Sequence, residues 1–368
     1  MLLLLASLWN SSPEDELLEA LQSRHARLRN VIVNFEFTES FMDPPDASQV
    51  TAALSTAQNP GQKIVEFLPQ GVYPGKGLFK FSNGASRFES DSFRGTRSVD
   101  VQVFAKGRAE HLWQEDSDES KQAYFGSIHP AAETQLPRDA TLSYALGLRL
   151  NFKNDWLTEE ALKSGKVAFD AETKLATVTF VDPEQPEKIN HRWTVDPAHA
   201  YRLVRYEQIQ KDPSNTIPDY ASAEVENLTF ETINGIDLPK KIQRRRYAGF
   251  QSIRYSPYQS EVDVISYSIG DASNTEESML IEWPEGASII DYRTGAQFRR
   301  IDHAQVLTDE MLAEAAKKAA ESNAKLAAEA QRKKTNITSI IIQLGLMIGV
   351  IIWLRRRHQH KVSRQMLR

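Results

Sequence analysis

The strongest constraint on the fold is a succession of short alternating segments joined by short turns. In the first segment Val31, Val33, Phe35 and Phe37 alternate with a mostly polar set of residues, which is the period of a β-strand with one strongly apolar face. The chain is therefore predicted to be mainly β. Further strands are predicted at residues 63–68, 77–82, 85–93, 97–105, 108–115, 166–169, 175–181, 189–195, 201–210, 221–233, 238–247 and 261–269.

The turns between these segments predict how the strands pair. Asn83-Gly84 has the composition of a tight hairpin turn, and turn residues also gather at Asp170–Thr173, Asp196–His199 and Asn234-Gly235. Strands joined in this way lie antiparallel, because a parallel pair needs a long crossover. With no Gly- or Ser-rich linker between the segments, we expect one antiparallel sheet from about residue 31 to residue 269.

A helix is predicted ahead of the first strand. Ser12 is suited to the N-cap and Pro13 to the first helical position. Side chains that suit a buried face then recur at helical spacing: Leu17, Leu18, Leu21, His25 and Leu28. This helix can cover part of the apolar face of the sheet. Short helices are also predicted near residues 48–57, 142–150 and 158–163.

The C-terminal part of the chain predicts a membrane anchor. Residues 337–354 are free of charge and are followed by three arginines. As an α-helix they would extend about 27 Å, close to the ~30 Å hydrocarbon thickness of a bilayer, so we expect one transmembrane helix and a basic tail at 355–368. Gly345 and Gly349 have the spacing that lets two spans pack closely, which leaves a homodimer through the span open. Residues 308–334, rich in Ala, Glu and Lys, predict a helical stalk.

The orientation of this anchor follows from both ends of the chain. Residues 1–11 contain a short apolar run that matches the core of a secretory signal, although no Lys or Arg precedes it. Basic residues are more numerous after the span than shortly before it, which favours a cytoplasmic C-terminus. We therefore expect residues 12–300 to form an extracytoplasmic domain. A tail-anchored cytosolic protein is the competing topology.

Composition excludes several classes of function. The formal net charge is −5 although the tail is basic, so the main domain is acidic and unsuited to binding nucleic acid. Without cysteine the chain has no disulfide, thiolate zinc site, cysteine nucleophile or lipid-modified cysteine. It also contains no His-Glu-x-x-His, Gly-x-Ser-x-Gly, phosphate loop or dinucleotide fingerprint. We expect no enzymatic activity, no cofactor and no metal site.

Two polar clusters have simple structural interpretations. His191 and His199 flank one turn, which is typical of surface hairpin residues more than of metal ligands. The run Arg244-Arg245-Arg246 lies in a predicted strand, whose alternate members point to opposite faces. It is interpreted as a solvated edge and not as an anion site.

The amount of apolar surface is the most informative feature for function. A sheet with repeated aromatic residues on one face needs something to cover it, either the chain's own helices or a ligand. Core packing and the wall of a groove for an acyl chain are both open for each aromatic. The candidate ligand-binding residues on this face are Phe35, Phe37, Phe79, Phe81, Trp113 and Trp193.

The order of elements resembles the lipoprotein-carrier superfamily of bacterial envelopes, the LolA/LolB-like half-barrels. The local resemblance is carried by Trp193–Pro197, Tyr201–Tyr206 and the Gly-Ile-Asp-Leu-Pro sequence within Asn234–Ile242, and it extends over about residues 12–269. It implies an antiparallel curved sheet, a half-barrel, covered by the N-terminal helix and enclosing an apolar cavity.

Two departures from that family shape the functional expectation. A mobile carrier must leave its membrane, whereas this chain has a predicted anchor, and a lipid-anchored receptor needs a cysteine that is absent. We expect a single-pass protein of the bacterial inner membrane whose periplasmic domain holds a lipid, an acyl chain or a lipidated peptide. The alternative is an envelope sensor or structural ectodomain that acts by contact with another envelope protein and has no lipid ligand.

Overall fold

The computed structural model describes residues 12–41, 71–93, 97–115, 123–130, 140–149, 161–162, 164–182, 186–211, 219–250, 253–298, 301, 303–329, 331, 344 and 347–348. The chain divides into two compact units. The first comprises residues 1–293 and 298–307, and the second comprises residues 294–297 and 308–368. The sheet and the pocket described below belong to the first unit.

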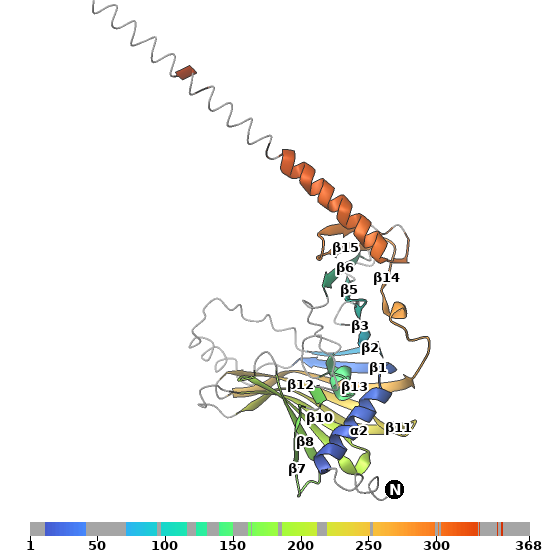
Figure 1. The fold of residues 1–368 in the computed structure, drawn as a ribbon, viewed down its shortest axis with the longest axis vertical. Coiled ribbons are helices and arrows are strands. Elements are labelled where there is room, and N and C mark those ends of the chain that lie inside the picture. Colours follow the sequence, from blue (N-terminus) through green and yellow to red (C-terminus); the bar gives the residue numbers. More distant parts are fainter. Residues whose placement is uncertain are drawn as a thin grey trace, which may run out of the picture. The chain divides into compact units, whose positions relative to one another are not determined.

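One long, curved and unclosed sheet organises the first unit (Figure 1). Its strands follow the order β15-β6-β5-β4-β3-β2-β1-β13-β12-β11-β10-β9-β8-β7, with every neighbouring pair antiparallel except β15 and β6. The strands are β1 (Asn30–Phe41), β2 (Gly71–Ser82), β3 (Ala85–Phe93), β4 (Arg97–Ala105), β5 (Arg108–Glu115), β6 (Ala123–Pro130), β7 (Lys166–Phe169), β8 (Ala176–Val181), β9 (Ile189–Asp196), β10 (Arg202–Gln210), β11 (Tyr220–Ile233), β12 (Ile236–Phe250), β13 (Ile253–Ile269) and β15 (Ser288–Asp291).

The predicted mainly β fold is confirmed, and its arrangement is two meanders joined in the middle. Strands β1 to β6 follow one another along one half of the sheet, and β7 to β13 along the other. They meet where β1 pairs with β13, with Val31 opposite Ile269. The Asn83-Gly84 turn has positive φ at both residues, as a tight hairpin requires.

Some elements escaped prediction from the sequence. Strand β6 contains Gly126, which breaks the apolar alternation, and a Cβ at that position would overlap the ring of Trp283. The short strands β14 (Glu282–Trp283), β16 (Ala296–Phe298) and β17 (Gln305–Val306) were also not predicted. The strand predicted at 63–68 and the helix predicted at 48–57 lie outside the described residues.

Helix α2 (Pro13–Arg27) precedes the sheet as predicted. Ser12 Oγ accepts a hydrogen bond from the Asp15 amide, and the Asp15 carboxylate accepts one from the Ser12 amide, which completes a capping box. The helix buries Leu17 and Leu21 in the hydrophobic core. Arg24 Nη1 donates to the Asp237 carbonyl at 2.8 Å, so the helix is also held to β12.

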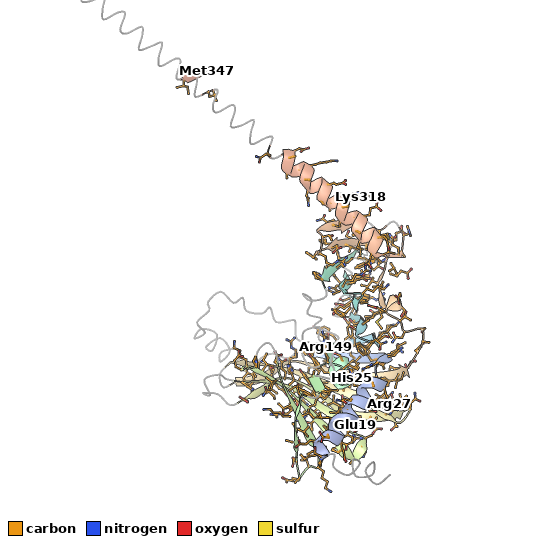
Figure 2. All side chains as sticks on the ribbon, in the orientation of Figure 1. Glu19, His25, Arg27, Arg149, Lys318 and Met347 are labelled. Atoms are coloured by element: carbon orange, nitrogen blue, oxygen red, sulfur yellow. The ribbon has the colours of Figure 1, made fainter. Side chains whose placement is uncertain are left out.

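The core lies on the face of the sheet that packs against α2 and the short helix α4 (Ala140–Ala145), here called the inner face. It joins both meanders into one hydrophobic cluster. Its largest fully buried members include Trp193, Tyr144, Tyr206, Phe79 and Phe180. Arg149, labelled in Figure 2, is also fully buried in this unit.

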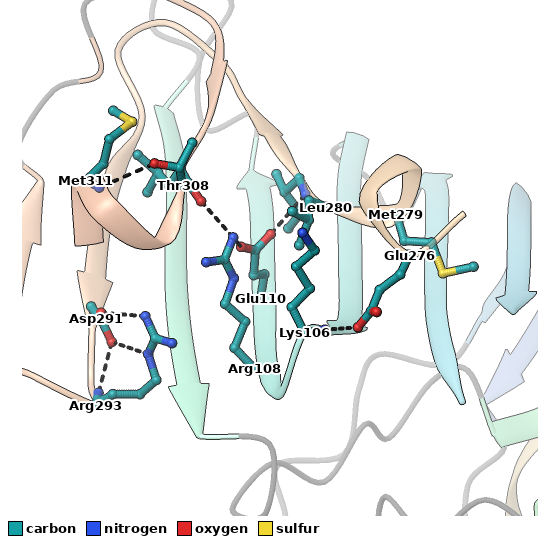
Figure 3. Close-up of polar contacts among 12 residues, drawn as sticks. Lys106, Arg108, Glu110, Glu276, Met279, Leu280, Asp291, Arg293, Thr308 and Met311 are labelled. Atoms are coloured by element: carbon teal, nitrogen blue, oxygen red, sulfur yellow. Dashed lines mark hydrogen bonds and ion pairs between the residues drawn. The ribbon is translucent and has the colours of Figure 1, made fainter. Parts of the chain in front are cut away.

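Beyond β13 the chain returns across β3 to β6 as a strap, residues 276–291. Arg87 Nη1 donates to the carbonyls of Met279 and Leu280 at 3.0 and 2.8 Å. Arg108 and Glu110 are 1% and 0% exposed and form an ion pair of 2.8 Å (Figure 3). Glu110 also accepts from the Ile281 amide at 2.9 Å, so this buried pair anchors the strap to β5.

The predicted stalk and anchor belong to the second unit. Residues 309–329 are helical, and Lys318 of this helix pairs with Glu314 at 2.7 Å (Figure 2). Nearly all of the predicted span at 337–354, including Gly345 and Gly349, lies outside the described residues, as do the predicted signal at 1–11 and the tail at 355–368. Within the described part of the chain, no helix has both the length and the apolar character needed to cross a membrane.

The role of the buried Arg108–Glu110 pair in holding the strap can be tested by mutation. Replacing Glu110→Ala leaves the Arg108 charge buried without its partner, which should lower the free energy of unfolding by about 3–5 kcal/mol. The exposed pair Asp91–Arg97 is the matched control, and Asp91→Ala should cost less than about 1 kcal/mol. Denaturant unfolding of the two variants measures both values. Equal and small losses would contradict the anchoring role of Glu110.

Candidate functional site

The candidate site lies on the inner face where β1, β13 and β12 run side by side. Because side chains alternate along a strand, Phe35, Phe37 and Glu39 of β1 share this face. The register places Val262 of β13 opposite Phe37, and Ser260 opposite Glu39. On the far side of β13, Ile242 stands opposite Val262 and Arg244 opposite Ser260. Two neighbouring rows of side chains on this face therefore differ in character. The row that contains Phe37 is apolar, and the next row, which contains Glu39 and Arg244, is charged.

Two glycines of β2 shape the apolar part. Gly77 lies opposite Phe35 and Gly75 opposite Phe37 in the register. A Cβ atom at either glycine would overlap the facing phenylalanine ring. The two rings therefore lie down over β2, and Phe35 packs against Phe88 of β3 with ring centroids 5.8 Å apart. This tilt leaves space above the rings.

That space is a small pocket of about 40 Å³. It holds no more than a few water-sized groups, since one water needs about 10–15 Å³ of such volume. One end of its lining is apolar and the other carries hydroxyl and carboxyl groups. The lining residues are Phe35, Phe37, Phe88, Leu142 and Val262, and then Glu39, Ser90, Ser92, Thr141, Tyr258 and Ser260.

The polar end is organised around Tyr258. Its hydroxyl donates to Glu39 Oε1 at 3.0 Å, and burial raises the pKa of Tyr258, so the phenol remains a donor at neutral pH. The guanidinium of Arg244 lies over the Tyr258 ring, 5.7 Å from its centroid. Arg244 Nη1 also donates to Thr141 Oγ1 at 3.1 Å. Arg244 therefore borders the pocket beside two of its lining residues.

The interpretation of the arginine run as a solvated edge is wrong for Arg244. This side chain is only 4% exposed, because β12 lies inside the sheet between β11 and β13. Arg245 points to the opposite face, where its Nη1 lies 3.8 Å from Glu224 Oε2. Arg246 is exposed, although partial desolvation, together with the neighbouring Arg244, lowers its pKa.

The other predicted aromatics fall in different places. Phe79, Phe81 and Trp193 are buried members of the hydrophobic core and do not line the pocket. Trp113 is half-buried on β5, outside this core, with its ring centroid 6.2 Å from that of Phe125. Of the six candidates, Phe35 and Phe37 are brought together at the pocket.

The polar lining residues were not selected from the sequence. The signal was present for Glu39, which continues the alternation of Phe35 and Phe37 by one more step. Arg244 stands in the same relation to Ile242 on β12. Tyr258 and Ser260 lie before the start predicted for the last strand at residue 261, so their face could not be assigned.

The surface position expected for His191 is also wrong. The residue is 2% exposed, with Nδ1 2.9 Å from Tyr206 Oη and Nε2 3.1 Å from Asp182 Oδ2. A Tyr-His-Asp chain can relay protons, but Tyr206 is 1% exposed and stacked on Tyr144 at 4.2 Å, so no substrate reaches it. His199, by contrast, has a side chain 54% exposed, as expected.

Other hollows and clusters were compared with this pocket. A larger open hollow of about 540 Å³ lies at the Asn83-Gly84 and Lys106-Gly107 turns. Its buried polar side chain, Asn274, already donates to Asn30 Oδ1 and to the Phe81 carbonyl. Among the described residues, no three His, Asp or Glu side chains converge as a metal site would require.

Solved structures that are similar to this chain include the following three. A domain from Vibrio parahaemolyticus assigned to outer membrane lipoprotein sorting matches with 9% identity and a TM-score of 0.39, covering 72% of this chain and 99% of that one. A DUF1329 family protein from Desulfovibrio piger matches with 6% identity and a TM-score of 0.37, over 73% and 100%. A LolA superfamily protein from Nitrosomonas europaea matches with 12% identity and a TM-score of 0.35, over 74% and 99%.

No family model and no curated protein matches the sequence. These solved structures include a lipoprotein-sorting domain and a member of the LolA superfamily, which is the family that the sequence resembles. The proposal below rests on the pocket itself.

The buried His191 predicts a pH dependence of stability. Burial lowers the pKa of His191, and Asp182 offsets only part of that effect. As pH falls below about 6.5, the unfolded chain takes up the proton first, so stability decreases with falling pH. Denaturant unfolding between pH 7.5 and 5.5 should show a smaller loss for His191→Gln than for the wild type. An equal slope in the two proteins would contradict the assignment.

Proposed function

We propose that this chain binds an amphiphile, a lipid or acyl chain with a polar end, on the inner face of its sheet. The observation that carries the proposal is the order of groups at the pocket. Phe35 and Phe37 line its apolar end, Glu39 lines its polar end, and Arg244 lies in the same row as Glu39. An apolar wall that ends in fixed charges matches a molecule with an apolar tail and a polar head.

The pocket must widen to accept a long chain. At about 40 Å³ it holds only a few methylene groups. The Phe37 ring and helix α4, which supplies Thr141 and Leu142, are the parts of the wall that can move outward without breaking the pairing of the sheet. Shape changes of this kind are common when a protein binds a flexible partner.

The same small volume favours a second candidate function. The inner face is filled mostly by the chain's own side chains, as expected for an envelope sensor or structural ectodomain without a lipid ligand. In that case the partner is another envelope protein. Both candidates are binding functions.

The position of the domain is part of the proposal. The apolar residues 337–354 and the basic residues that follow them support a single-pass anchor in the bacterial inner membrane with the sheet on the periplasmic side. A reporter enzyme fused after Arg368 tests this arrangement. Activity characteristic of the cytoplasm is expected, and a periplasmic signal would overturn the orientation.

The glycines beneath the rings give a direct test of binding. Gly75→Ala pushes the Phe37 ring into the pocket, so the full chain should bind a dansyl-labelled fatty acid about tenfold more weakly, a loss of ~1.4 kcal/mol. Fluorescence titration measures the change. Lys76→Ala is the matched control, because the side chain of Lys76 points to the opposite face of β2. Absence of binding by the wild-type chain would exclude the lipid function and leave the ectodomain function.

A further inference from the structure

The starting observation is a buried charge without a counter-charge. Arg244 is 4% exposed, yet its guanidinium has a hydroxyl and an aromatic ring as partners, and no carboxylate of the described residues lies within ion-pair distance. Arg108 differs, because it has Glu110 at 2.8 Å, whereas Arg24 of α2 donates to a backbone carbonyl. A buried charge without a counter-charge is costly.

A second arginine strengthens the positive charge at this place. Arg246 lies two residues further along β12 on the same face, opposite Tyr258 in the register. It is exposed and therefore reachable from solvent. Because Arg245 points to the other face and pairs with Glu224, the run places two of its three arginines on the face of β12 that borders the pocket.

The nearest pocket carboxylate, Glu39, forms no ion pair with Arg244. Glu39 is separated from Arg244 by the whole of β13, a distance of about 10 Å between the outer strands. Its Oε1 is occupied by the Tyr258 hydroxyl. Opposite charges are therefore separated at the polar end of the pocket. The negative charge of Glu39 lies on β1, and the positive charges lie on β12.

This separation of charges favours a ligand with an anionic head group. A guanidinium offers paired N–H donors in one plane, which match the two oxygens of a carboxylate or a phosphate. Hydrogen bonds between charged groups in a partly buried site are stronger than those to a neutral hydroxyl. Glu39 would repel an anion from the β1 side and so direct it toward β12.

Resting on the function proposed above, we propose that the amphiphile bound by this chain is an anionic one, with its carboxylate or phosphate held by Arg244 and Arg246 and its apolar tail against Phe35 and Phe37. A free fatty acid and a monoacyl phosphate lipid share this chemistry. A neutral lipid of equal chain length lacks the charge that these arginines require.

The test compares matched acyl probes on the full chain. Pyrene-labelled hexadecanoic acid, the corresponding alcohol and a monoacylglycerol phosphate are titrated under identical conditions. The wild-type chain should bind the acid or the phosphate at least about tenfold more tightly than the alcohol, a difference of ~1.4 kcal/mol. The ratio between the acid and the phosphate identifies which anion is preferred.

Variants assign the selectivity to the named side chains. Arg244→Met and Arg246→Met should each reduce the preference for the anion while leaving the affinity for the alcohol unchanged. Arg245→Met, on the opposite face, is the matched control and should keep the wild-type ratio. Because Arg244→Met removes an unpaired buried charge, its melting temperature should equal or exceed that of the wild type.

The outcomes separate this inference from the function on which it rests. Binding of the acid and the alcohol with equal affinity would overturn the anion assignment and leave lipid binding intact. No binding of any probe would exclude lipid binding itself. Loss of stability in Arg244→Met without loss of selectivity in Arg246→Met would show that Arg244 serves the fold.

Discussion

The pairing of β1 with β13 is the constraint on which the rest of the structure depends. It joins the first strand of one meander to the last strand of the other, and both strands are then hydrogen-bonded on two sides. A shift of one residue in this register would turn Phe35 and Phe37 away from the core and expose them. The same register fixes Glu39, Ser260 and Arg244 in one row. The core and the candidate site are therefore set by a single alignment.

Buried charges divide the first unit into structural and candidate functional regions. At the strap, Arg108 and Glu110 neutralise each other and satisfy backbone groups of the segments they hold. At the pocket, Arg244 has neutral partners only. Both arrangements remove a guanidinium from water. Only at the strap does a buried carboxylate offset the free energy of that desolvation. On the proposal made above, the second arrangement leaves part of the interaction free energy of Arg244 for an anionic ligand.

The sequence predicted those features that depend on local chemistry. Turn residues and alternation predicted β3, β4, β5 and β7 to the residue, because both signals are local in the sequence. The capping residues at Ser12 predicted α2 for the same reason. Strand β6 was not predicted, because Gly126 interrupts its alternation. The ring of Trp283, which is distant in sequence, occupies the space that a Cβ atom at Gly126 would need. The closure of β1 on β13 is likewise a long-range contact without a local signal.

The candidate site shows the same contrast between features with a local sequence signal and features that depend on long-range contacts. Phe35 and Phe37 were predicted because alternation alone assigns them to the apolar face. Burial of Arg244 could not be predicted, because it depends on β12 lying between β11 and β13. His191 was misjudged for a similar reason: its turn is exposed, whereas its own side chain points to the inner face and meets Tyr206. The local sequence pattern shows which side chains share one face of a strand. The order of the strands in the sheet decides whether that face is covered by other parts of the chain.

The most direct measurement is photo-crosslinking of the full chain in living cells supplied with a diazirine-bearing fatty acid, followed by mapping of the modified peptides. If the inner face holds an acyl chain, the label should fall on the peptides of β1, β13 and α4 that carry Phe37, Val262 and Leu142. Label confined to other peptides of the first unit, or a protein that remains unlabelled, would contradict the account.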